Sequence, residues 1–186
     1  PPRSTLFPYT TLFRSGYLLG LLDEAEQRYN VDLDRVYFMG HSNGGFMSFR
    51  MACEAGDRIA GIMQLAGAMP KDPTLCNDAG PVAILSVHGT NDDTIPFEST
   101  ARYAGAVDSL ATWIDRGGCG AEPTSEEGPA YTLDTGTTVT RWDCAAADVE
   151  LWALDGAGHL PSFSTAFAPA MLDWLLARPR TARAAE

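Results

Sequence analysis

The spacing of apolar residues from Gly16 onward predicts alternating helices and strands. Apolar residues at positions 17, 18, 21, 22 and 25, with acidic and amide residues opposite, predict an amphipathic helix that ends near Asn30. Further helices are expected over 43–54, 101–116 and 166–176, strands over 35–39, 81–87 and 149–154, and one hairpin arm over 137–142. This alternation predicts an α/β fold with a mostly parallel sheet and flanking helices.

The first 15 residues do not share this pattern. The run from Thr5 to Ser15 reads like the translation of a common short-read sequencing adapter, and Pro2 and Pro8 interrupt the first 15 residues. It has neither the continuous apolar core nor the cleavage site of a signal peptide. We therefore interpret residues 1–15 as a non-native segment, with a genuine N-terminal strand as the alternative.

The composition excludes several classes of protein. Hydrophobic residues make up 45% and charged residues 20% of the 186 positions, which suits one compact globular domain rather than a disordered chain. No run reaches the roughly 20 apolar residues of a membrane-spanning helix. The net charge of −11 would repel phosphate backbones, so we expect no nucleic-acid partner.

Residues 40–44 form a Gly-His-Ser-Asn-Gly motif between a predicted strand and a predicted helix. This context favours a nucleophile elbow, in which Ser42 occupies a sharp turn with its hydroxyl exposed. We expect Gly40 and Gly44 to be small because a side chain at either position would clash in the turn. The backbone N–H of Asn43 is the natural first oxyanion donor. The alternative is a glycine-rich turn with a capping serine.

A serine nucleophile needs a base, and the chain offers three histidines. In folds that carry a nucleophile elbow, the base follows the acid in the sequence, which favours His159. This residue lies in a glycine-rich loop directly after the predicted strand 149–154; an exposed loop histidine is the alternative. We expect the side chain of His41 to point elsewhere and His88 to support packing or its loop.

The acid is expected on the loop that follows the strand 81–87. Asp92 and Asp93 both lie there, and their spacing alone does not distinguish them. One of them would hold the histidine in its working tautomer. A site of this kind needs no cofactor, and no cysteine and histidine cluster suggests a metal.

Several motifs follow one another in the order of a known family. They are residues 31–37 (Val-Asp-Leu-Asp-Arg-Val-Tyr), 40–45 (Gly-His-Ser-Asn-Gly-Gly), 51–54 (Met-Ala-Cys-Glu), 88–92 (His-Gly-Thr-Asn-Asp), Trp113, 118–119 (Gly-Cys) and 156–159 (Gly-Ala-Gly-His). Together they resemble the polyhydroxybutyrate depolymerase and feruloyl esterase group of α/β-hydrolases.

The resemblance implies an α/β-hydrolase fold with Ser42 as nucleophile, His159 as base and Asp92, rather than Asp93, as acid. It also implies that residues 16–186 are the C-terminal part of a catalytic domain whose early strands, with the second oxyanion donor, are missing. The sequence departs from the family where Leu160-Pro161 replaces the usual Trp-Pro.

The four cysteines indicate an oxidising compartment. An even number without C-x-x-C spacing favours disulfides, and we favour Cys53–Cys76 and Cys119–Cys144 because each joins segments close in sequence. Four free thiols are the alternative. The family resemblance likewise implies secretion or a periplasmic location.

The expected function is a serine carboxylesterase that hydrolyses polyester or hydroxycinnamate esters. Its partner would be a small or polymeric ester. One alternative is a serine peptidase or thioesterase on the same scaffold. Another is a non-catalytic chain, either a truncated remnant or a module that binds carbohydrate surfaces.

Overall fold

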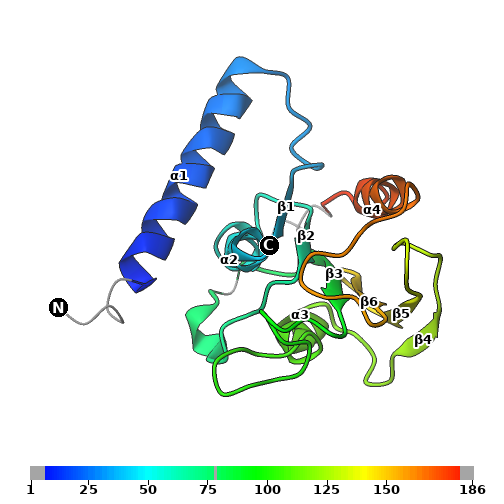
Figure 1. The fold of residues 1–186 in the computed structure, drawn as a ribbon. Coiled ribbons are helices and arrows are strands. Elements are labelled where there is room, and N and C mark those ends of the chain that lie inside the picture. The colour runs from blue at the N-terminus through cyan, green and yellow to red at the C-terminus, as the bar shows by residue number, and fades with distance from the viewer. Residues whose placement is uncertain (1–6, 78, 181–186) are drawn as a thin grey trace.

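The computed structural model describes residues 7–77 and 79–180, which form one six-stranded sheet with helices on both faces (Figure 1). The strand order is β1-β2-β3-β6-β5-β4. Strands β1 to β3 and β6 are parallel neighbours, whereas β5 and β4 run antiparallel. The strands are β1 (Tyr37–His41), β2 (Gly61–Leu65), β3 (Ala83–Gly89), β4 (Thr124–Glu127), β5 (Thr137–Trp142) and β6 (Val149–Leu154). The expected mostly parallel α/β sheet is confirmed.

Helices connect these strands and cover the sheet. They are α1 (Phe7–Arg28), α2 (Asn43–Ala55), α3 (Ala111–Arg116) and α4 (Phe167–Leu176), with short 3₁₀ turns η2 (Pro73–Leu75) and η3 (Asp108–Leu110). Helix α1 contacts α2 and extends away from the sheet beside it (Figure 1). Within the described residues, no helix is long and apolar enough to cross a bilayer.

Two hydrophobic cores lie on opposite faces of the sheet because side chains alternate along each strand. In β3, Ile84 belongs to the core beneath α2, and Leu85 belongs to the core beneath α4. The four tryptophans, Trp113, Trp142, Trp152 and Trp174, are all buried in these cores. Tryptophan therefore contributes to packing in this part of the chain.

The observed elements differ from the expected ones in four places. Helix α1 begins at Phe7, earlier than the helix expected from position 17; residues 1–6 lie outside the described residues. Strands β2 and β4 were not predicted at all. The helix expected over 101–116 is limited to η3 and α3, because Ser99 and Thr100 hydroxyls bind loop N–H groups that a helix would have used.

Strand β1 lies at the edge of the sheet. In the part of the chain that the structure describes, only β2 pairs with it. Its residues are less buried than those of β2, and Met39 is half exposed.

Two disulfides join the pairs that the sequence analysis favoured. Cys53 at the end of α2 is bonded to Cys76, just after η2. Cys119, which follows α3, is bonded to Cys144 in the loop between β5 and β6. All four sulfur atoms are thus used, and both bonds pack in or against the core beneath α2.

Candidate active site

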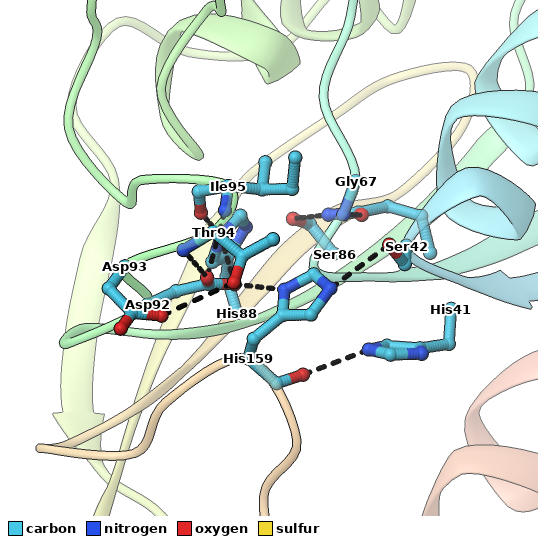
Figure 2. Close-up of polar contacts among 11 residues, drawn as sticks. His41, Ser42, Gly67, Ser86, His88, Asp92, Asp93, Thr94, Ile95 and His159 are labelled. Atoms are coloured by element: carbon cyan, nitrogen blue, oxygen red, sulfur yellow. Dashed lines mark hydrogen bonds and ion pairs between the residues drawn. The ribbon is translucent and has the colours of Figure 1, made fainter.

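Three loops at the carboxyl ends of parallel strands bring the candidate residues together. Ser42 follows β1, Asp92 follows β3, and His159 follows β6. The carboxyl ends of neighbouring parallel strands share one edge of the sheet, and α/β proteins with parallel sheets bind their ligands at this edge. Figure 2 shows His159 between Asp92 on one side and Ser42 on the other.

Ser42 occupies a strained turn between β1 and α2. Its φ of 54° and ψ of −116° lie in a region that residues with side chains rarely adopt. The turn is held because the Ser42 N–H donates to the Leu65 carbonyl at 2.8 Å, and the Ser42 carbonyl accepts from Phe46 at 3.1 Å. The expected strand-turn-helix geometry is therefore present.

The two glycines flanking the serine are not equivalent. A Cβ at Gly40 would lie 2.5 Å from the backbone carbon of Gly44, so only glycine fits there. A Cβ at Gly44 would meet no described atom within 4 Å apart from its chain neighbours and the backbone of its own helix. The expectation that both positions must be small is correct for Gly40 and wrong for Gly44, because the side chain of residue 44 would point away from the turn.

A buried polar network that sequence reasoning missed supports the elbow from β2. The Gln64 side chain accepts from the Gly67 N–H at 2.7 Å and donates to Ser86 Oγ at 2.6 Å. Gly67 in turn packs directly on Gly45, where a Cβ on Gly67 would lie 2.6 Å from the Gly45 backbone. The available signal was a glutamine inside an otherwise apolar run over 61–65.

His159 contacts both other residues of the candidate triad. Its Nε2 lies 3.0 Å from Ser42 Oγ, and its Nδ1 lies 2.8 Å from Asp92 Oδ2. An ionised carboxylate only accepts hydrogen bonds, so Nδ1 carries the proton and Nε2 offers a lone pair to the serine hydroxyl. This tautomer can deprotonate the hydroxyl.

Asp92 is buried, and its two oxygen atoms have separate partners. Oδ1 accepts from the backbone N–H groups of Thr94 and Ile95, each at 2.9 Å, while Oδ2 accepts from His159. Burial by itself would raise the pKa of Asp92, but these hydrogen bonds outweigh it and hold that pKa below its ordinary value. Asp93 is exposed and contacts Thr94 instead, so the structure brings Asp92 and not Asp93 to His159.

His88 supports the loop that carries the acid, as expected. Its ring is buried, Nε2 donates to the Ile95 carbonyl at 2.8 Å, and Nδ1 has no hydrogen-bond partner among the described residues. Burial lowers the pKa of His88 despite the opposing effects of the Ile95 carbonyl and the Asp92 carboxylate. A neutral histidine therefore lies beside the acid.

The expectation that His41 points away from the site is wrong. Its Nε2 lies 2.8 Å from the His159 carbonyl oxygen, and the two rings are 4.8 Å apart between centroids (Figure 2). The sequence gives no sign of this contact, because it depends on how the loop after β6 folds back over the end of β1.

The beginning of α2 supplies a positive backbone environment beside Ser42. Asn43 is the first residue of the helix, and first-turn N–H groups have no acceptor within their own helix. Its N–H is therefore free of an intrahelical acceptor, and its role as first oxyanion donor stays a prediction. Among the described residues, no group of three or more metal-ligating side chains is present.

Comparison with known proteins identifies the family. The sequence profile of the family described as phospholipase/carboxylesterase matches residues 17–115, which is more than half of the chain. The chain is 30% identical over 82% of its length to NocK of Nocardia uniformis subsp. tsuyamanensis, a protein named as an esterase. It is 28% identical over 77% of its length to feruloyl esterase C of Emericella nidulans. The chain spans about half the length of these curated relatives, 50% and 49%.

Solved structures support the same fold. An acetyl xylan esterase from Aspergillus awamori matches with a TM-score of 0.67 and 14% identity, over 87% of this chain and 66% of that one. SOBER1 from Arabidopsis thaliana matches with a TM-score of 0.61 and 17% identity, over 91% and 65%. The sequence match, the sheet order and the turn at Ser42 agree: the chain belongs to the phospholipase/carboxylesterase family and has the α/β-hydrolase fold.

Proposed function

We propose that the protein is a serine carboxylesterase in which Ser42 is the nucleophile, His159 the general base and Asp92 the orienting acid. The observation that carries this proposal is the continuous hydrogen-bonded chain from Ser42 Oγ through the His159 ring to Asp92 Oδ2. The lowered pKa of Asp92 supports it, because an ionised acid stabilises the imidazolium that forms during the reaction.

The first half of the reaction transfers the acyl group to Ser42. As Oγ bonds to the ester carbonyl carbon, its proton passes to His159 Nε2, and the carbonyl oxygen becomes an oxyanion that the Asn43 N–H can bind. The intermediate then breaks its bond to the alcohol oxygen, which takes the proton from His159. An acyl-serine and a free alcohol result.

The second half returns the enzyme to its starting state. A water molecule gives its proton to His159 Nε2 while its oxygen bonds to the acyl carbon. When the bond to Ser42 Oγ breaks, the serine recovers the proton and the carboxylic acid leaves. The imidazole changes its charge in each half, so its orientation by Asp92 matters throughout.

For the substrate class, we propose esters of hydroxycinnamates or polyesters of the hydroxyalkanoate type. The likeness to a feruloyl esterase supports the first class more directly. We also propose an extracellular or periplasmic location, which the two disulfides support because such bonds persist in oxidising compartments.

Labelling with a fluorophosphonate probe tests the proposed nucleophile. The probe bonds to an activated serine, so the full chain should be labelled and Ser42→Ala should not. Turnover of para-nitrophenyl esters, feruloyl esters, soluble polyester oligomers and aminoacyl anilides then ranks the substrates, with the anilides expected to be the poorest. Undiminished labelling of Ser42→Ala would exclude Ser42 as the nucleophile. Preferred cleavage of anilides would favour a peptidase.

A further inference from the structure

His41 links the strand that carries the nucleophile to the backbone of the candidate base. The carbonyl oxygen of His159 has no hydrogen to give, so His41 Nε2, 2.8 Å away, must carry the proton and donate it. The two imidazole rings also pack together, with an angle of 46° between their planes. His41 therefore holds His159 by a hydrogen bond to its main chain and by a contact with its ring.

The loop that carries His159 needs such a restraint. It contains two glycines, and Gly156 has a φ of 75°, so the backbone there has more freedom than elsewhere. The N–H of Gly156 donates to Thr90 Oγ1, and the Ala157 carbonyl accepts from Asn91. These bonds hold the loop before His159, whereas the bond from His41 is made to His159 itself.

We propose that His41 is a positioning residue that sets the distance between Ser42 and the His159 ring. His41 and Ser42 are adjacent in the chain, so the bond from His41 ties the backbone of His159 to the residue next to the nucleophile. The inference rests on the proposed function. It gives His41 a positioning role, which is distinct from the role of Ser42 as the nucleophile. In this role His41 neither gives nor takes a proton during the reaction.

Two substitutions separate the hydrogen bond from the volume of the ring. His41→Gln keeps an amide N–H that can reach the position of Nε2, whereas His41→Leu fills similar space and cannot donate. We expect His41→Leu to lower kcat about tenfold with a smaller change in KM, since a small displacement of the base weakens proton transfer more than binding. His41→Gln should recover most of the loss, and Met39→Ala, at a half-exposed position on the same strand, should leave kcat unchanged.

Nitrogen NMR of the imidazole rings gives a readout that does not depend on turnover. The chain has only three histidines, so each ring can be assigned by single substitutions. We expect His41 in the Nε2–H tautomer, and we expect His41→Leu to weaken the N–H signal of His159 Nδ1, which donates to Asp92. If the role of His41 were purely structural, His41→Leu and His41→Gln would both lower the stability of the fold, and His41→Gln would not recover kcat.

The outcomes distinguish this inference from the proposed function. If the full chain reacts with fluorophosphonate but His41→Leu keeps the full kcat, the positioning role is wrong. The same conclusion follows if His41 is found in the Nδ1–H tautomer. If the full chain does not react at all, the proposed function fails, and the His41 tautomer measured in Ser42→Ala still tests the contact.

Discussion

Asp92 and Asp93 have the same side chain and adjacent positions, yet only one of them is placed to act on His159. The buried Asp92 accepts three hydrogen bonds, whereas the exposed Asp93 accepts one from Thr94. The loop backbone makes this difference, since it turns the carboxylate of Asp92 inward to the N–H groups of residues 94 and 95. Chemical identity alone therefore does not decide which aspartate contacts His159.

The two aspartates form a matched pair for mutation. Asp92→Asn should lower kcat by about 10³- to 10⁴-fold, because a neutral amide no longer stabilises the imidazolium or fixes the tautomer of His159. Asp93→Asn removes the same charge from an exposed position and should change kcat less than twofold, within the roughly 0.5 kcal/mol typical of surface substitutions. Steady-state kinetics on a para-nitrophenyl ester checks both. Equal losses in the two variants would contradict the assignment.

The buried His88 should make the stability of the fold depend on pH. Burial lowers its pKa in the folded protein, while in the unfolded chain it returns to about 6.5. At a pH between these two pKa values, the unfolded chain binds more protons than the folded chain. The free energy of unfolding therefore falls as the pH drops below about 6.5, and His88 causes no such loss above that pH. His88→Gln can keep the donor to Ile95 without titrating. Thermal unfolding between pH 5 and 7 should therefore show a shallower pH dependence for His88→Gln, and identical slopes would be the contrary result.

At the scale of elements, the turn from β1 to α2 depends on close backbone approach at one glycine only. A Cβ on Gly40 would overlap the backbone of Gly44, so Gly40→Ala should destabilise the fold by about 1–3 kcal/mol. Gly44→Ala meets open space inside a helix and should stabilise it by about 0.5–1 kcal/mol. Urea unfolding of both variants measures these opposite signs. Destabilisation of both proteins by similar amounts would show that the turn is crowded on both sides.

Elements with strong patterns could be predicted from the sequence, and elements that depend on tertiary contacts could not. The strand before Ser42, the helix after it and β6 follow from apolar runs and glycine placement. Strand β2 was missed because Gln64 interrupts its apolar run, and that glutamine finds its hydrogen-bond partners Gly67 and Ser86 outside the strand. Strand β4 is exposed along its length, so it has no apolar pattern to find.

The candidate site was partly predictable for the same reason. Ser42 and His159 follow from the elbow motif and the order of residues along the chain, and the structure brings them within 3.0 Å. The distinction between Asp92 and Asp93 required the family resemblance, because both lie on one short loop. The contact of His41 with His159 joins residues 118 positions apart in the chain, and no local pattern carries that information.

At the scale of the whole molecule, the outer edge of β1 is the least protected part of the sheet. No described strand pairs with it, and its residues are only partly buried. Unpaired strand edges recruit other strands, so we expect the folded 186-residue chain to associate as its concentration rises. Met39→Lys places a charge at this edge and should reduce the association. Light scattering during gel filtration would measure the association, and a monomer at all concentrations would contradict the expectation.

The placement of the two disulfides makes the halves of this molecule respond differently to a thiol reductant. Both bonds tie segments that pack on the α2 side, whereas α4 is attached through non-covalent contacts such as the bond from Trp174 to the buried Glu150 carboxylate. Reduction therefore removes restraints from one layer and leaves the other as it was. A protease added after the reductant should cut first around Cys76 and Cys144, while the segment that ends in α4 stays intact.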